Sequence, residues 1–299
     1  KEVSNECYYV DKTLLIRDII DNHSKVYLFT RPRRFGKTLT MDMVRTFFEK
    51  TDTDTSIYFK DKYIWRAGAA YKEKQGQYPV IFLTFKDAHQ STWQDMYASL
   101  CFTLRNEFLR HIELTTSARL SDYDKKYLKS ILDDEATIID YQFALGKLSA
   151  MLSKHYGRNV IVIIDEYDTP IQQGHIFGYY DEVIGFMRNL LSAVLKDNPS
   201  LELGILTGIL RIAKESLFSG LNNLVVNTIL DDEYCNILDL EEEVSAMAQY
   251  YGVSDRLGEI KEWYDGYMFG RTEYIIRGRL LITSITNVFP KPSGQEQVQ

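Results

Sequence analysis

The chain has 299 residues, of which 45% are hydrophobic and 26% charged, so it is neither collagen-like nor wholly disordered. Its net charge of -7 argues against a generally basic nucleic-acid binder. The three cysteines are far apart, which indicates neither a disulfide framework nor a zinc site and favours a cytoplasmic location. No apolar run approaches the about 20 residues of a membrane helix, so no membrane partner is expected. Because the chain begins with Lys1 rather than Met, we expect it to be a fragment.

The first predicted element is a buried strand at residues 25–30, followed by a helix at 38–50. Between them, RPRRFGKT (31–38) matches the end of the phosphate-loop pattern, which is Gly, four residues, then Gly-Lys-Ser/Thr. Arg31 stands where the pattern has its first glycine. Gly36 lets backbone amides approach a phosphate, Lys37 can bind the β- and γ-phosphates, and Thr38 can hold Mg²⁺. The expected nucleotide contacts are Arg31, Pro32, Arg33, Arg34, Phe35, Gly36, Lys37 and Thr38.

The arginines of this segment have three possible roles. Arg31, Arg33 and Arg34 can bind phosphate groups bidentately, touch a nucleic-acid backbone, or form ion pairs with neighbouring acidic groups. The sequence alone leaves these alternatives open.

Further along the chain, apolar runs alternate with segments of helical spacing. Strands are expected at 79–85, 160–164, 203–206 and 223–230, and helices at 91–110, 138–156 and 181–195. This order predicts an α/β fold with a mostly parallel sheet flanked by helices. We expect a lead segment at 1–24, a nucleotide-binding core at 25–230 and a helical extension at 231–273.

The strand at 160–164 runs directly into Asp165 and Glu166. A buried strand that ends in Asp-Glu is typical of the second half of a phosphate-loop ATPase. Asp165 is expected to bind Mg²⁺, and Glu166 to polarise the attacking water as a general base. Alone, the pair also fits an ordinary strand with a solvated acidic turn, but the upstream Lys37 loop favours the catalytic interpretation.

The strand at 203–206 leads to Thr207, which is expected to sense the γ-phosphate beside the acidic strand. Arg211 follows and is a candidate to stabilise charge in the transition state. A surface position for Arg211 is an equally good interpretation.

Six segments together resemble one family, the AAA-ATPase-like bacterial proteins that are often fused to a C-terminal PD-(D/E)XK nuclease-like domain. They are YYVDKT (8–13), RPRRFGKT (31–38), IIDEYD (163–168), TGILRI (207–212), SGLNN (219–223) and WYDGY (263–267). Arg31 is usual in this family. The resemblance implies a P-loop NTPase fold with ATP and Mg²⁺ as cofactors. It also suggests a homo-oligomer and, through a nuclease-like domain, nucleic acid as further partners.

The resemblance stops at YIIRGRL (274–280). The family continues there with a stretch like Tyr-Asn-Pro-Trp-Ser, and these codons read one frame over can encode that stretch. We therefore expect a one-nucleotide frameshift near Glu273, with residues 274–299 out of frame. The alternative is a divergent but genuine C-terminus, and resequencing of the gene distinguishes the two.

Three functions are compatible with these motifs. An ATP hydrolase needs Lys37, Thr38, Asp165 and Glu166 together, and all four occur in the expected order. A nucleotide-binding switch or scaffold with little hydrolysis is the alternative, favoured by Arg31 and by the lack of a clear arginine finger. A GTPase ranks last, because no Asn/Thr-Lys-x-Asp motif is found.

Overall fold

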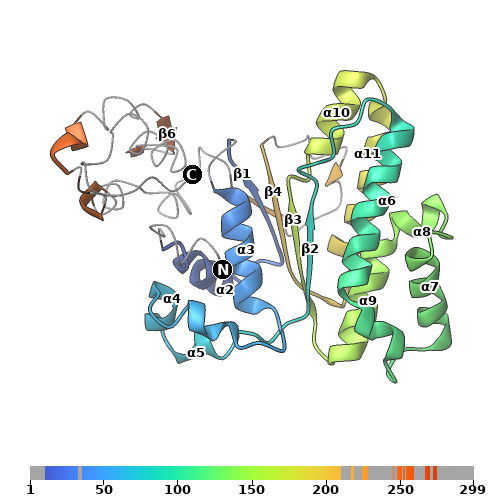
Figure 1. Ribbon diagram of the computed structural model, residues 1–299, viewed down its shortest axis with the longest axis horizontal. Coiled ribbons are helices and arrows are strands. Elements are labelled where there is room, and N and C mark those ends of the chain that lie inside the picture. The colour runs from blue at the N-terminus through green and yellow to red at the C-terminus, as the bar shows by residue number, and fades with distance from the viewer. Residues whose placement is uncertain are drawn as a thin grey trace, which may run out of the picture.

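The computed structural model describes residues 11–32, 36–209, 217–218, 224–227, 245, 248–250, 252, 254–258, 267–269 and 272–274. Its centre is a five-stranded, all-parallel sheet in the order β2-β3-β4-β1-β5 (Figure 1). The strands are β1 (Val26–Thr30), β2 (Val80–Thr84), β3 (Val160–Asp165), β4 (Leu201–Gly208) and β5 (Leu224–Asn227). The predicted α/β fold is therefore confirmed, and it is consistent with a P-loop NTPase.

Helices cover both faces of this sheet, as Figure 1 shows. One face carries α2 (Leu14–Asn22), α3 (Lys37–Phe48), η1 (Thr55–Tyr58), α4 (Tyr63–Arg66) and α5 (Ala69–Lys72). The other carries α6 (Trp93–Arg110), η2 (Ile112–Thr116), α7 (Asp122–Leu132), α8 (Ile138–Gln142), α9 (Ala144–Tyr156), α10 (Thr169–Phe177) and α11 (Tyr180–Leu195).

The interior strand β3 explains why the sheet needs two helical layers. Val162 and Ile164 belong to the hydrophobic core under α6, α9 and α11, whereas Ile161 and Ile163 belong to the core under α2 and α3. Successive side chains of a strand point to opposite faces, so an uninterrupted apolar run must be covered on both sides.

Two predicted elements differ from the structure. The helix expected at 138–156 is interrupted at Phe143, whose backbone (φ -101, ψ 2) lies between α8 and α9. Thr137 caps α8 separately through a capping box with Asp140. Within the expected helical extension at 231–273, residues 248–250 and 257–258 are helical. However, β6 (Tyr267–Phe269) pairs with β7 (Thr272–Tyr274) as an antiparallel pair. Apart from Tyr274, the segment expected to be out of frame, residues 274–299, lies outside the described residues.

The outer edge of β2 is covered by charged side chains of α6. Glu107 accepts the N–H of Phe82 at 2.9 Å. Arg110 donates to the carbonyl of Val80 and, at 2.6 Å, to Glu107. Backbone groups on the outside of an edge strand otherwise offer a template for another chain, so these bonds protect the sheet.

His111 titrates within this charged cluster, 3.3 Å from Glu107 and 3.4 Å from Glu113. Burial lowers the pKa of His111, but the two neighbouring carboxylates, which favour the protonated ring, raise it overall above the usual value of 6.5. Because the folded protein binds this proton more tightly than the unfolded chain, protonation of His111 stabilises the fold. The stabilisation is complete below about pH 6.5 and is lost as the pH rises through the folded-state pKa. We expect the stability advantage of the unmodified protein over His111→Gln, measured by urea denaturation, to shrink above about pH 6.5. Parallel pH profiles for the two proteins would contradict this expectation.

Candidate functional site

The polar strand ends identified in the sequence meet at one edge of the sheet. All five strands run in the same direction, so their carboxyl ends share that edge, where open α/β sheets bind ligands. Strand β4 lies between β1 and β3. In the sheet, the end of β4 therefore lies between the end of β1, which leads into the phosphate-loop segment, and Asp165 at the end of β3.

Thr38 and Asp165 form the central contact of this edge. The Thr38 hydroxyl donates to Asp165 Oδ2 at 2.7 Å, although the two residues are 127 positions apart in the chain. Thr38 stands in the first turn of α3, and Asp165 is the last residue of β3 and is fully buried. The fold thus brings together the two motif halves that the sequence places far apart.

Thr207 links Asp165 to Glu166. Its hydroxyl donates to Asp165 Oδ1 and accepts the backbone N–H of Glu166 at 3.3 Å. Its main-chain carbonyl accepts the N–H of Tyr167 at 3.0 Å. The Thr207 side chain is only 1% exposed. In the structure, Thr207 holds the acidic strand end in place, and the sensing of a γ-phosphate stays a prediction.

Gly36 and Lys37 define the described end of the phosphate loop. Gly36 has φ +70, a left-handed conformation that strains any residue with a Cβ, and its carbonyl accepts the N–H of Thr40 at 2.9 Å as α3 begins. The Lys37 ammonium donates to the carbonyl oxygens of Arg31 and Pro32 at 2.9 Å each. Because the N-cap of α3 is Gly36, no N-cap side chain bonds to the first-turn amides of the helix, which suits an anion there.

Arg31 bonds to the main chain at the start of the phosphate loop. Its guanidinium donates to the carbonyl oxygens of Thr30 and Asn227 at 3.0 Å each, and the residue is 5% exposed. Main-chain carbonyls at the ends of β1 and β5 therefore accept the bonds of Nη1, and a phosphate contact of Arg31 stays a prediction.

Glu166 adopts a left-handed backbone conformation (φ 54) immediately after β3. A non-glycine residue in this region is strained, and such residues concentrate at functional sites. Its carboxylate accepts a hydrogen bond from the Thr169 hydroxyl at 3.3 Å, at the start of α10. Sequence reasoning identified Glu166 but missed Thr169, and no motif signals it.

Asp168 joins the acidic loop to the exit of β4. Its Oδ2 accepts the backbone N–H of Ile209 at 3.0 Å and the side-chain amide of Gln172 at 2.7 Å. A Cβ on Gly208 would lie 2.7 Å from Asp168 Oδ1 and also 2.7 Å from the Tyr167 ring. Position 208 thus requires glycine because of this close approach. Asp168 of the segment 163–168 therefore packs directly against Gly208 of the segment 207–212.

The other predicted site residues lie outside the described residues. These are Arg33, Arg34, Phe35 and Arg211. Their roles as phosphate, nucleic-acid or transition-state contacts stay predictions.

The donor atoms at this edge fit a magnesium ion. Mg²⁺ prefers hard oxygen ligands and is usually held by one or two protein side chains together with phosphate oxygens and water. The Thr38 hydroxyl and the Asp165 carboxylate are such donors, and they lie in direct contact at 2.7 Å. The described residues contain no cluster of three or more His, Cys, Asp or Glu side chains that could hold a metal ion.

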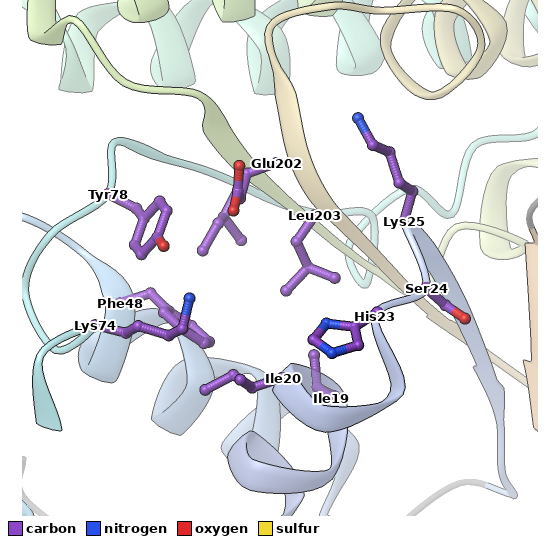
Figure 2. A pocket seen from close by; sticks show the side chains of 11 residues that line it. Ile19, Ile20, His23, Ser24, Lys25, Phe48, Lys74, Tyr78, Glu202 and Leu203 are labelled. Carbon is purple, nitrogen blue, oxygen red and sulfur yellow. The ribbon is translucent and has the colours of Figure 1, made fainter. Parts of the chain in front are cut away.

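A pocket of about 240 Å³ lies at the opposite edge of the sheet, beside the beginnings of β1, β3 and β4 (Figure 2). Figure 2 shows Tyr78, Lys74, His23, Ile20 and Leu203 among the side chains that line it. None of the described residues that are expected to contact ATP lines this pocket, which lies at the other edge of the sheet from them.

Comparisons with known proteins identify a family and a relative of similar sequence. A family model described as "Predicted AAA-ATPase" matches residues 2–218. The "Uncharacterized protein in vnfD 5'region" of Azotobacter chroococcum mcd 1 is 26% identical over 268 residues. That alignment covers 88% of this chain and 45% of the relative, so the chain spans less than half of the relative's length. No solved structure matches.

These matches leave three expectations about domains and partners as predictions, namely the fused nuclease-like domain, the nucleic-acid partner and the homo-oligomer. In the part of the chain that the structure describes, no helix has the length and apolarity to cross a membrane. The family model covers well over half of the chain, including both halves of the motif that meet at Thr38 and Asp165. The chain therefore belongs to the AAA-ATPase-like family.

Proposed function

We propose that the protein binds Mg-ATP at the carboxyl edge of the sheet and hydrolyses it. The contact between Thr38 and Asp165 carries this proposal, because it unites a phosphate-loop helix with an acidic strand end. Membership of a family described as "Predicted AAA-ATPase" supports ATP as the nucleotide.

The residues of the site have separate roles in this proposal. Lys37 binds the β- and γ-phosphates, which compete with the two loop carbonyls for its ammonium group. Thr38 and Asp165 hold Mg²⁺, which when bound neutralises charge on the phosphate oxygens. Glu166 accepts a proton from the attacking water. Thr207 holds the Asp165 carboxylate and the Glu166 backbone in place through its hydroxyl group.

A nucleotide-binding switch with little hydrolysis is the second candidate. One observation favours it: the Glu166 carboxylate is engaged by the Thr169 hydroxyl at 3.3 Å. A general base held away from the water would leave ATP bound but intact. The two functions share the binding site and differ only in turnover.

Phosphate release from ATP by the purified protein, with and without Mg²⁺, tests the proposal. Steady Mg-dependent turnover supports the hydrolase. Tight ATP binding by calorimetry without turnover supports the switch. Absence of ATP binding would contradict both.

The Thr207 hydroxyl provides a further prediction. Thr207→Val keeps the side-chain shape but leaves a buried carboxylate oxygen and a backbone N–H without their partner. We expect Thr207→Val to lower Mg-dependent ATP turnover about tenfold or more, since one lost charge-assisted hydrogen bond is worth that much. Thr207→Ser retains the hydroxyl and is the control, expected to stay close to the unmodified protein. Equal turnover in the two variants would show that the hydroxyl does not position the acidic pair.

A further inference from the structure

Arg31 joins the ends of three neighbouring strands. Its backbone N–H donates to the Gly208 carbonyl of β4 at 3.0 Å. Its guanidinium Nη1 donates to the carbonyls of Thr30 in β1 and Asn227 in β5, at 3.0 Å each. The phosphate-loop pattern has glycine at this position, and glycine can supply only the first of these bonds.

Strand β5 is the element that gains most from the guanidinium. It is an edge strand of four residues paired with β1, and its first three side chains are only half-buried, whereas β1 is buried throughout. A short edge strand with little apolar burial relies on the hydrogen bonds at its ends. The Thr30 hydroxyl also points to the Asn227 carbonyl, but at 3.5 Å, so Arg31 supplies the shorter bond.

The same residue also supports Lys37. The Arg31 carbonyl accepts a hydrogen bond from the Lys37 ammonium at 2.9 Å. The guanidinium of Arg31 therefore anchors the same stretch of main chain whose carbonyl orients Lys37. Glycine at this position would leave that carbonyl on a more flexible backbone.

We propose that Arg31 is a positioning residue, whose guanidinium ties the start of the phosphate loop to β5 and thereby fixes the carbonyl that orients Lys37. The effect on nucleotide binding rests on the proposed function, whereas the tie to β5 does not. The acceptors of Nη1 are main-chain carbonyls, which distinguishes this role from that of a direct phosphate ligand.

Two measurements on Arg31→Gly, Arg31→Ala and Arg31→Lys test the proposal. Hydrogen exchange of peptides that cover 224–227, measured without nucleotide, should speed up in the glycine and alanine variants. Calorimetry with Mg-ATP should show about tenfold or more weaker binding in both, although Arg31→Gly restores the generic motif. Arg31→Lys keeps the charge without the planar fork and should be intermediate in both measurements. The control is Arg119→Ala. Arg119 is an exposed arginine outside the site, and it too donates to a main-chain carbonyl, that of His155, at 2.8 Å.

Each outcome decides the question. Binding by Arg31→Gly as tight as that of the unmodified protein would overturn the proposal. Weaker binding by Arg31→Ala with unchanged exchange at 224–227 would also overturn it, and would assign the guanidinium to the phosphates. If the unmodified protein binds no Mg-ATP, the proposed function fails, and the exchange comparison still decides the tie to β5. If the glycine and alanine variants do not fold, Arg31→Lys decides: faster exchange with weaker binding supports the proposal, and unmodified values overturn it.

Discussion

Replacing Glu166 with Gln is expected to leave Mg-ATP binding intact and to lower hydrolysis about 100-fold or more, because an amide cannot accept the proton of the attacking water. Gln has the size of Glu and keeps a Cβ, so the left-handed backbone at position 166 is equally strained in both proteins. Its side-chain amide can still accept the bond from Thr169. Steady-state phosphate release and ATP affinity, measured side by side, test this expectation.

Two comparisons make the Glu166 result specific. Asp165→Asn should weaken the Mg²⁺ dependence of binding itself, since Asp165 is the expected metal ligand. Glu202→Gln makes the same chemical change at an exposed residue beside the pocket on the opposite edge, and should leave both measurements unchanged. Turnover by Glu166→Gln at the unmodified rate would exclude Glu166 as the general base. Tight binding without turnover in the unmodified protein, unaltered by the substitution, would leave only the switch.

Lys37→Ala is expected to weaken Mg-ATP binding roughly 10- to 100-fold, the loss expected for hydrogen bonds to a charged group. The Lys37 ammonium bonds to two main-chain carbonyls of its own loop, and neither bond crosses the hydrophobic core. The fold should therefore survive, as circular dichroism and thermal unfolding can verify. Calorimetry gives the affinity.

Lys25→Ala is the matched control for Lys37→Ala. Lys25 also donates to a main-chain carbonyl, that of Leu201 at 3.4 Å, but it precedes β1 and lines the pocket at the other edge of the sheet. The Lys25→Ala variant should bind Mg-ATP like the unmodified protein. Equal affinities for Lys37→Ala and Lys25→Ala would mean that GKT at 36–38 is a chance match to the motif.

The sequence by itself determined the five strands of the main sheet, several of the helices and the motif residues. An apolar run such as 160–164 must be a strand buried on both faces, and the structure confirms it as β3. The contents of the site were also predictable in part, because Gly36, Lys37, Thr38 and Asp165 each follow or precede a recognisable element. These signals are local: each depends on residues within about one turn or one strand.

Only the tertiary structure decided which of these residues meet. Hydrophobic periodicity carries no information on strand order, so nothing in the sequence placed β4 between β1 and β3 or made Thr207 a bridge from Asp165 to the Glu166 backbone. The direction of Arg31 was likewise undetermined, since a guanidinium beside a phosphate loop suits either phosphate or carbonyl oxygens. The carbonyl of Asn227 accepts it because β5, almost 200 residues later, pairs with β1, and contacts at that separation arise from packing rather than from local pattern.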